Sequence, residues 1–398
     1  MPNEWKKEKI ASIGEVVSGA TPKTMEPSYW DGSLVWVTPK DLSRLNSAYI
    51  DTSERKITDA GFESCSAAKL PVNSLIMSSR APIGYLAINR VPATTNQGCK
   101  SIIPKAGVST EYLYYYLTQN IDDVKRLGTG STFAEVGKSA VESVEILVPP
   151  IAEQKSIADI LLTVDEEIQR TEAIICAAEK LRTGLMFVFF VEEPRRNKAN
   201  KYSFKEVLES IIDHRGLTPK KLGGDWSSQG IPTISAMNVK NGRIVKPDEI
   251  RFVDEDLYKK WMPEEIREGD VLLTSEAPLG QTYVVKSGEK FCLSQRLFGL
   301  RPNPKKISGE YLYYFLTSPI GEKRLFDRAT GSTAKGIRQT ELLKVEINPP
   351  NLLRQKEIIS ILTSVDEKIS VNQIIKEKLE ILKKGLMADL LSGSVRVL

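Results

Sequence analysis

A repeat of about two hundred residues is the feature that most constrains the fold of this chain. The segment EYLYYYLT at residues 111–118 returns as EYLYYFLT at residues 310–317, and VDE at residues 164–166 returns at residues 365–367. The first pair lies 199 residues apart and the second 201. So long a period, running through 398 residues, indicates one unit written twice and not a short-period solenoid. We therefore expect two similar domains related by a pseudo-two-fold axis.

The first part of each copy has the pattern of a compact β-rich domain. Gly, Pro, Asn and Ser interrupt residues 1–150 and 194–350 roughly every ten residues, with short apolar runs such as 34–37 between them. Short strands separated by turn residues are typical of a mainly antiparallel fold. One helix is expected near residues 110–120, and its repeat near residues 309–318.

The second part of each copy is predicted to be one long helix. Segments 151–193 and 351–398 each follow a Pro-Pro pair, which suits a helix start. Apolar residues then recur at alternating steps of four and three, the heptad spacing of paired helices. The seam positions are Ile157, Leu161, Val164, Ile168 and Thr171 in the first copy and Ile358, Leu362, Val365, Ile369 and Asn372 in the second. They continue as Ile174, Ala178, Leu181, Leu185 and Phe189, and as Ile375, Leu379, Leu382, Leu386 and Leu390.

The simplest arrangement pairs the two helices with each other in antiparallel orientation, and the polar residues Thr171 and Asn372 would then fix the register. The alternative is that each helix packs on its own domain as a core helix. The predicted fold class is α+β: two similar, mainly β domains separated by a long antiparallel two-helix coiled coil, with an internal pseudo-two-fold duplication.

Composition disfavours several classes of enzyme. A single histidine, His214, speaks against His-rich metal sites and Ser/His/Asp triads, and the four cysteines never reach a C-x-x-C spacing. The N-terminal segment is charged and lacks an apolar stretch, so we do not expect a signal peptide, and the longest apolar run, residues 185–191, is too short to span a membrane. A reduced, cytoplasmic protein is expected. The formal net charge of +4 alone does not reveal a nucleic-acid partner.

Two segments resemble catalytic motifs without matching them. Gly137-Lys138-Ser139 looks like the end of a phosphate-binding loop, but Thr132 stands where the partner glycine belongs. Asn348-Pro349-Pro350 resembles the tetrapeptide with which adenine methyltransferases hold a flipped base, but Asn351 replaces the aromatic residue. We therefore expect neither catalysis nor a metal or cofactor site in this chain.

Polar side chains in the loops of both copies are the candidates for contact with DNA. Arg, Asn and Gln suit base edges, while hydroxyls and Lys suit phosphates; the same residue types also suit turns and loop caps. The candidates in the first copy are Thr21, Lys23, Lys40, Ser79, Arg80, Asn96, Gln97, Thr129, Ser131, Thr132 and Lys138. Those in the second copy are Arg215, Thr218, Lys220, Asn238, Ser294, Gln295, Arg296, Thr330, Ser332, Thr333, Lys335 and Arg338.

The two copies differ at candidate reading positions while they agree at scaffold positions. Arg80 corresponds to Glu276, and Lys40 corresponds to Met237. Two domains that share a scaffold but read different sequences would show this contrast, and so would ordinary drift.

Together these features resemble the specificity subunit of Type I restriction–modification enzymes. The resemblance covers essentially the whole chain and rests on the Pro-Pro pairs, the Gln-Lys turns at residues 154–155 and 355–356, the long helices that end in Gly-Leu-Met, and the turn RGLTP at residues 215–219. It also includes SRAPIG at residues 79–84, from which the second copy departs at Glu276. A shared contact role at that position is therefore in doubt.

The resemblance implies that residues 1–150 and 194–350 are target-recognition domains, each reading half of a bipartite double-stranded DNA site in the major groove. Segments 151–193 and 351–398 would be conserved helices that set the unread spacer and dock two methyltransferase subunits, on which restriction and translocase subunits assemble. S-adenosylmethionine, ATP and Mg²⁺ would belong to those partners, and this chain would bind no cofactor itself. The alternatives are a solitary or fused adenine-N6 DNA methyltransferase fragment, and a structural coiled-coil linker that touches no nucleic acid.

Overall fold

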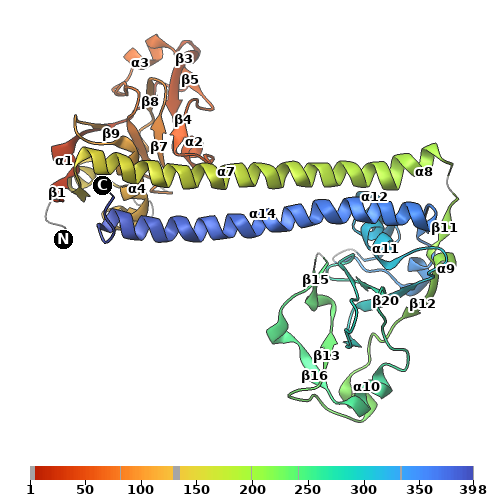
Figure 1. Cartoon of the computed structure of the whole chain (residues 1–398). Coiled ribbons are helices and arrows are strands. Elements are labelled where there is room, and N and C mark those ends of the chain that lie inside the picture. The colour runs from red at the N-terminus through yellow and green to blue at the C-terminus, as the bar shows by residue number, and fades with distance from the viewer. Residues whose placement is uncertain are drawn as a thin grey trace. The chain divides into compact units, whose positions relative to one another are not determined.

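The computed structural model describes residues 5–80, 82–128, 135–198, 200–240, 242–331 and 334–397. The chain divides into two compact units: unit 1 comprises residues 1–173 and 372–398, and unit 2 comprises residues 174–371. Each unit therefore holds one β-rich domain together with part of both long helices (Figure 1). The candidates Thr129, Ser131, Thr132, Ser332 and Thr333 lie outside the described residues.

The β-rich domain of unit 1 consists of three small sheets and several short helices. Its elements are β1 (Lys6–Lys9), α1 (Ile10–Ile13), β2 (Gly14–Ser18), η1 (Pro27–Tyr29), β3 (Trp30–Val37), α2 (Pro39–Ser43), β4 (Tyr49–Ile50), β5 (Lys56–Ile57), α3 (Asp59–Glu63), β6 (Leu75–Ser78), β7 (Leu86–Asn89), β8 (Ala93–Thr95), β9 (Cys99–Pro104), α4 (Thr110–Gln119), α5 (Ile121–Arg126), α6 (Lys138–Ser143) and β10 (Glu145–Val148).

The largest sheet of unit 1 has the order β2-β9-β6-β7-β4, beside a sheet β5-β3-β8 and a ribbon β1-β10. Among the described strands, β3 with β8 and β4 with β7 pair in parallel, and the other pairs are antiparallel. All four residues of β6 are buried. On one face of the sheet, Leu113 and Leu117 of α4 pack with Leu75. On the other face, Ile76 packs with Val37 of β3. The predicted antiparallel β-rich domain and its helix are confirmed.

The β-rich domain of unit 2 repeats this plan. Its elements are β11 (Tyr202–Ser203), α9 (Phe204–Val207), β12 (Leu208–Ile212), η3 (Pro219–Leu222), β13 (Ile231–Ile234), η4 (Ala236–Asn238), β14 (Val239–Lys240), β15 (Arg243–Ile244), η5 (Pro247–Glu249), β16 (Arg251–Val253), α10 (Glu255–Trp261), β17 (Val271–Thr274), β18 (Thr282–Val284), β19 (Cys292–Leu293), β20 (Leu297–Pro302), α11 (Gly309–Leu316), α12 (Pro319–Phe326), α13 (Gln339–Leu342) and β21 (Glu346–Ile347).

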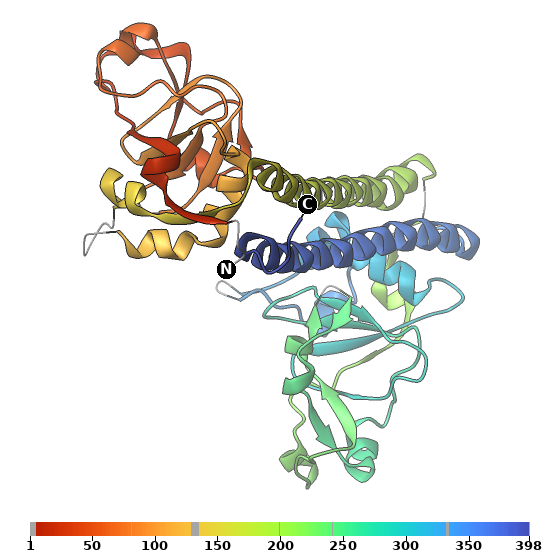
Figure 2. The same ribbon diagram turned by 60° about the vertical axis from the view of Figure 1, so that its left-hand side comes forward.

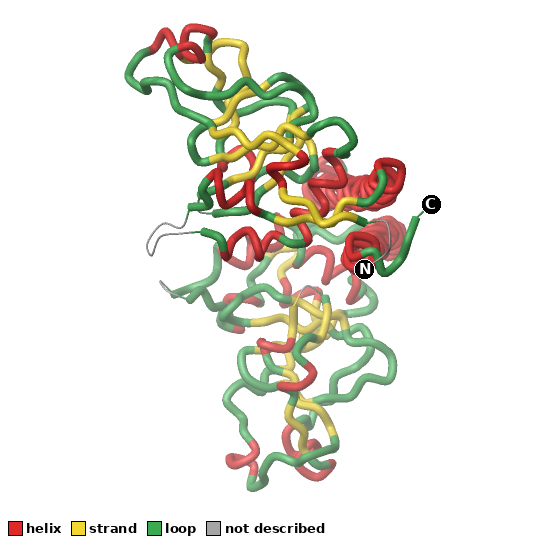
Figure 3. The backbone as a smooth tube through the Cα atoms, turned by 90° about the vertical axis from the view of Figure 1, so that its left-hand side faces the viewer, coloured by secondary structure: helices red, strands yellow, loops and turns green. Residues whose placement is uncertain are grey.

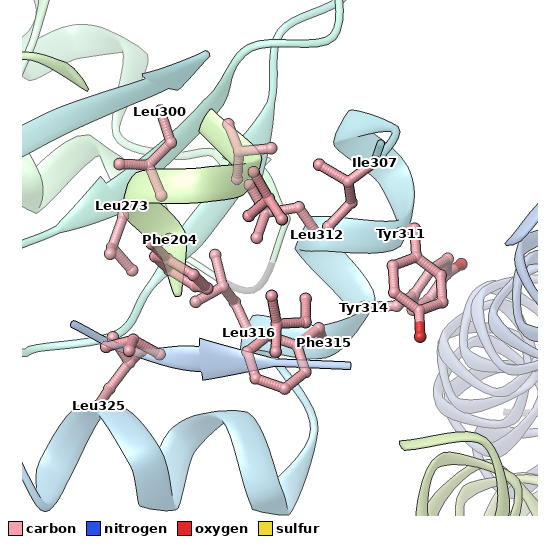
Figure 4. Close-up of a cluster of buried hydrophobic side chains, with 14 of the residues drawn as sticks. Phe204, Leu273, Leu300, Ile307, Tyr311, Leu312, Tyr314, Phe315, Leu316 and Leu325 are labelled. Carbon is pink, nitrogen blue, oxygen red and sulfur yellow. The ribbon is translucent and has the colours of Figure 1, made fainter. Parts of the chain in front are cut away.

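The sheets of unit 2 follow the same order as those of unit 1. The strand order β12-β20-β17-β18 matches β2-β9-β6-β7, β16-β13-β19 matches β5-β3-β8, and β11-β21 matches β1-β10. Strands of each unit and the helices that cover them can be compared in Figure 3. Around α11, the core gathers Phe204, Leu273, Leu312 and Phe315, while Tyr311 and Tyr314 point toward the long helices (Figure 4).

The long helices are α7 (Ile151–Phe187, 37 residues) and α14 (Leu352–Ser392, 41 residues). A π-helical turn, η2 (Val188–Glu192), and α8 (Glu193–Arg196) continue α7. In unit 1 the start of α7 lies beside the end of α14 (Figure 2). Ile157 and Leu161 of α7 share a buried cluster with Met387 and Leu390 of α14. In unit 2 the end of α7 meets the start of α14, where Met186 shares a cluster with Ile358 and Leu362. The antiparallel pairing is thereby confirmed.

Each helix also contacts a β-rich domain, so the two arrangements considered from the sequence occur together. Tyr112 and Tyr115 of α4 join the cluster of Ile157 and Leu161 in unit 1. Tyr311 of α11 joins the cluster of Ile358 in unit 2. The helix pair and the domain of each unit thus share one apolar core.

The predicted seam is right in the first half of each helix and partly right in the second, where Ala178, Phe189 and Leu390 are buried as predicted. Ile157, Leu161, Ile358 and Leu362 are fully buried, Val164 and Thr171 nearly so, and Ile168, Val365, Ile369 and Asn372 are half-buried. By contrast, Ile174, Leu181, Ile375 and Leu382 are 41%, 54%, 41% and 50% exposed. The heptad in fact continues from residue 171 through Ile175, Ala178 and Arg182, and from residue 372 through Lys376, Leu379 and Lys383. Charged residues hold those inward positions because they pair with carboxylates of the other helix.

Candidate nucleic-acid interface

Loops from distant parts of the first copy meet at one edge of unit 1. The loop after β2 is tied to the end of β8 by the bond from Ala20 N to Thr95 O, at 2.9 Å, and the loop after β8 is tied to the end of β3 by the bond from Asn96 N to Val37 O, at 3.0 Å. The loop after β6 lies between two others, since Ser79 N donates to Gly98 O at 2.8 Å and Val136 N donates to Ser79 O at 2.9 Å. Backbone hydrogen bonds therefore fix a continuous edge made of the ends of β2, β3, β6 and β8 and the segment before α6; we call it edge 1.

Unit 2 builds the equivalent edge, edge 2, with equivalent bonds. Ser294 N donates to Ile234 O at 2.8 Å, which joins the loop after β19 to β13. Ser275 N donates to Arg296 O at 2.8 Å, and Ile337 N donates to Ser275 O at 2.9 Å. The loop after β17 thus lies between the loop after β19 and the segment before α13, as its counterpart does in unit 1.

The structure brings several predicted residues together on edge 1. Thr21 donates a hydrogen bond to the side chain of Gln97, which is exposed. The Asn96 side chain accepts from Gly98 N at 3.0 Å and so holds the turn that presents Gln97. Arg80 is exposed beside this turn. These loops present an amide and a guanidinium, the two groups that recognise adenine and guanine edges.

An ion-pair network orients Arg80. Its Nε donates to Glu135 at 2.9 Å, and the buried Lys100 lies 3.4 Å from the same carboxylate and from the Ser79 hydroxyl. Burial raises the pKa of the Glu135 carboxyl, but Arg80 and Lys100 together outweigh burial and hold it below its usual value. The carboxylate is therefore charged at neutral pH and fixes the direction of the guanidinium.

Edge 2 also carries an exposed arginine, but this arginine comes from the loop after β19 and not from the loop after β17. Glu276 stands where the first copy has Arg80, and it pairs with Arg296 of the next loop at 3.1 Å. Arg296 has a φ of 61°, so its backbone lies in the left-handed region, and its side chain is exposed beside Gln295. Both edges thus carry an exposed glutamine and an arginine held by a glutamate, although the arginine comes from different loops.

A further arginine stands near edge 2, in the turn after β12. Arg215 makes two hydrogen bonds to Asp213, both at 2.8 Å, and lies over the ring of Phe298 at 4.0 Å. Its neighbour His214 is half-buried, and burial lowers the pKa of its imidazole. The imidazole is therefore neutral at physiological pH, while the guanidinium is charged and held in one orientation.

The other candidates hold the loops together through hydrogen bonds and ion pairs, or they are exposed to solvent. Asn238 is buried, and its side chain accepts bonds from Ser235 in a capping box. Thr218 caps η3, Ser79 and Ser294 are buried, and Lys40 pairs with Glu54. The remaining candidates are exposed: Lys23, Lys138, Lys220, Thr330, Lys335 and Arg338. Contact of any of these residues with DNA stays a prediction.

Residues 2–179 and 197–381 match the family model described as the Type I restriction modification DNA specificity domain. The chain belongs to this family. It is also 30% identical over 420 residues to the Type I restriction enzyme MjaIX specificity subunit of Methanocaldococcus jannaschii, covering 100% of this chain and 95% of that protein. The MjaVIII specificity subunit of the same organism is 28% identical over 303 residues, covering 72% of this chain and 70% of that one. The chain is thus a non-catalytic specificity subunit.

The fold of this specificity subunit resembles that of a solved relative. The crystal structure of the S subunit of a Type I restriction–modification system from M. genitalium covers 98% of this chain and 97% of its own, with a TM-score of 0.62 and 15% identity.

Within the part of the chain that the structure describes, no group of three His, Cys, Asp or Glu side chains is placed to hold a metal ion. Among those residues, too, no helix is long and apolar enough to cross a membrane.

Several residues of the specificity subunit's edges were missed from the sequence. Glu135 and Lys100 orient Arg80, and Glu276 orients Arg296, but carboxylates are not among the residue types that suit contact with DNA. The repeat held a usable signal for the second case. The second copy has Glu276 where the first has Arg80, and it has Arg296 directly after Gln295, the counterpart of Gln97. The arginine of the second copy therefore comes from the next loop.

Proposed function

We propose that each unit of this specificity subunit reads one half of a bipartite DNA site through its edge. The observation that carries the proposal is the construction of the same edge twice, with the same backbone bonds and different side chains. An oriented Arg and an exposed Gln on each edge are suited to the donor and acceptor pattern of the major groove. The arginine's change of loop between Arg80 and Arg296 supports two different half-sites.

The two exposed glutamines give the sharpest test of this proposal. Gln97→Ala should relax the methylated motif at one half-site, and Gln295→Ala should relax it at the other, each by about 1–3 kcal/mol of discrimination. The measurement is the map of methylated adenines in cells that carry the complete system with each variant. Lys105→Ala serves as the control, because Lys105 bonds Ala11 and Ser12 backbone carbonyls away from edge 1. Relaxation of both half-sites by one variant would contradict separate reading.

The helices supply a surface for the partner subunits. In unit 2, Ile174, Leu181 and Val188 recur at intervals of seven and are 41%, 54% and 39% exposed. In unit 1, Ile375 and Leu382 occupy the matched positions and are 41% and 50% exposed. Exposed apolar residues that repeat along one helix face mark an interaction surface. We propose that each stripe docks one methyltransferase subunit, so that the chain binds two, on which the restriction subunits assemble.

Substitution in one stripe at a time tests this docking. Leu181→Glu should remove one methyltransferase subunit from the purified assembly, Leu382→Glu the other, and the double variant both, as read by native mass spectrometry. Val72→Glu, at a residue 47% exposed in the β-rich domain of unit 1, is the matched control and should leave both partners bound. Two bound partners in the double variant would refute the assignment of the stripes.

The catalytic steps would take place in the partner subunits. S-adenosylmethionine, ATP and Mg²⁺ would be bound by the methyltransferase and restriction subunits, while this chain selects the site and sets the spacer through α7 and α14. Removing seven residues from the middle of each helix should shorten the spacer by about three base pairs, since a residue of helix spans ~1.5 Å and a base pair ~3.4 Å. Half-sites should be unchanged in the methylation map; an unchanged spacer would contradict the role of the helices.

A further inference from the structure

Besides the apolar core that each recognition domain shares with the helix pair, two polar points of attachment recur in both units, and the first is a buried glutamine. Gln154, near the start of α7, accepts from Ser109 N at the start of α4 at 2.8 Å and donates to Gly107 O and Pro149 O at 3.2 and 2.8 Å. Its side chain is 1% exposed. This one amide therefore joins the first turns of α4 and α7.

The second copy repeats this glutamine anchor. Gln355 accepts from Ser308 N at 3.0 Å and donates to Lys306 O and Pro350 O at 2.8 and 2.9 Å. It too is 1% exposed. The equivalence extends to every partner of the side chain, so the anchor is a shared part of the scaffold.

The second point is a three-residue junction that joins three helices. In unit 1 the hydroxyl of Tyr115 on α4 donates to Asp165 on α7 at 2.7 Å, and Lys383 of α14 lies 2.6 Å from the other carboxylate oxygen. The junction therefore ties the recognition domain to both long helices at once. It lies eleven residues beyond Gln154, about 16 Å along the helix at ~1.5 Å per residue.

Unit 2 contains the same junction with the helices exchanged. Tyr314 of α11 donates to Asp366 on α14 at 3.1 Å, and Arg182 of α7 approaches the other oxygen of that carboxylate at 2.5 Å. Arg182 and Lys383 occupy matched positions 201 residues apart. The retained feature is thus a cation from the opposite helix, whether it is Lys or Arg.

Two separated anchors define an orientation, which a single anchor does not. Without the junction, the domain would be held by its glutamine and by apolar contacts, which are not directional, and a rotation about the glutamine would move its recognition edge relative to the helices. We propose that the Tyr–Asp–cation junctions are positioning sites that hold each recognition domain at one angle on the helix pair, and so restrict the enzyme to a single spacer length. This inference rests on the proposed reading of a bipartite site.

The test is the spacer distribution among methylated sites in cells that carry the complete system. Asp165→Asn weakens the junction of unit 1 and Asp366→Asn that of unit 2, while the polar contact to each tyrosine is kept in part. We expect sites with a spacer one base pair longer or shorter to rise at least about tenfold in either variant, which corresponds to ~1.4 kcal/mol of lost discrimination. The half-sites themselves should be unchanged, because both edges are intact.

Two controls separate positioning from general damage. Asp159→Asn removes an exposed carboxylate of α7 outside the junction and should leave one spacer. Lys383→Arg gives the junction of unit 1 the same cation that unit 2 has in Arg182, and methylated sites should again show a single spacer length. A single spacer in both Asp165→Asn and Asp366→Asn would overturn the inference. A wild-type map without any gapped motif would instead overturn the proposed function.

Variants that fail to assemble do not leave the inference open. If Asp165→Asn abolishes methylation, the milder Tyr115→Phe removes one hydroxyl and keeps the Asp165–Lys383 pair. The inference then requires a broadened spacer in Tyr115→Phe, and an unbroadened one refutes it.

Discussion

The two units share their anchors and differ in their edges. Gln154 and Gln355 make the same three bonds, and the Tyr–Asp–cation junction occurs in both units. At the edges, Arg80 is held by Glu135, whereas Arg296 is held by Glu276. The comparison teaches that the two domains keep the same buried contacts to the long helices, while the exposed side chains of their edges differ. Substitutions at matched positions can test both halves of that statement.

Matched core truncations should produce the largest effect and the same effect in both units. Leu113 and Leu312 are 0% exposed and lie at equivalent positions of α4 and α11. Each change to Ala removes buried methyl groups and leaves a cavity, and should cost about 2–5 kcal/mol of unfolding free energy. Urea unfolding of the intact chain, followed by fluorescence, is the measurement. A large cost in one unit beside a small cost in the other would show that the scaffolds are not equivalent.

The glutamine anchors should come next in size. Gln154→Leu and Gln355→Leu each leave a buried backbone N–H and two carbonyls without their partner, at about 1–3 kcal/mol for an unsatisfied group. Leu is close to Gln in volume, so little of the loss arises from packing. We expect similar falls in the urea midpoint for the two variants. Loss confined to one of them would indicate that the other unit has a substitute for its anchor.

The ends of the helices offer a comparison with reversed charge. Glu153 near the start of α7 accepts from Arg396 at 2.5 and 2.8 Å and from Trp5, while Arg354 near the start of α14 donates to Glu193, twice at 2.9 Å. Bonds from Arg396 and Arg354 hold the pKa of Glu153 and of Glu193 below the ordinary value of 4.5. A carboxyl with a lowered pKa stabilises the fold above the pKa it has in the unfolded chain. That stability is lost as the pH falls through the lower, folded value.

Glu153→Gln should therefore destabilise the chain by about 1–3 kcal/mol at pH 7, where Arg396 loses its charged partner. The difference from wild type should shrink as the pH falls from 4.5 through the lower pKa of folded Glu153, because the carboxyl of the unfolded chain binds its proton first and that of the folded chain follows. Arg354→Gln should show the same trend through Glu193. Urea midpoints at pH 7 and in acid measure both. A difference in urea midpoint between wild type and variant that stays constant with pH would rule out the charged pair as the cause of that difference.

Much of this architecture could be predicted from the sequence because the duplication shows each local pattern twice in one chain. The repeat, the two helices and the strand-rich domains depend on local periodicity. Ile157, Leu161, Val164, Ile358 and Leu362 are buried at the seam positions that this periodicity predicts. The prediction failed at Leu181 and Leu382, where apolar side chains are exposed. Hydropathy alone assigned them inward. In the structure, carboxylates on the opposite helix place Arg182 and Lys383 inside instead.

The edges could be predicted only in part for a similar reason. Gln97 and Gln295 were recognised by residue type, and both are exposed on their edges. The pairing of Arg80 with Glu135 joins residues 55 positions apart, and a local sequence pattern cannot predict a contact over that separation. Asn238 illustrates the converse, since a residue type suited to adenine is engaged in a buried capping box.

The smallest expected effect concerns a position where only one unit carries a charge. Lys40 is exposed and pairs with Glu54, while its counterpart Met237 is 54% exposed. Lys40→Ala should change stability by less than about 1 kcal/mol, since exposed ion pairs contribute little. If Lys40 contacts a phosphate, the variant should weaken DNA binding of the assembled enzyme equally for all sequences and reduce the slope of log K against log salt by about 0.9. Met237→Lys should raise that slope by a similar amount on the other half-site. Equal salt slopes in wild type, Lys40→Ala and Met237→Lys would place this position off the DNA in both units, and would confine the difference between the units to the loops that carry Arg80 and Arg296.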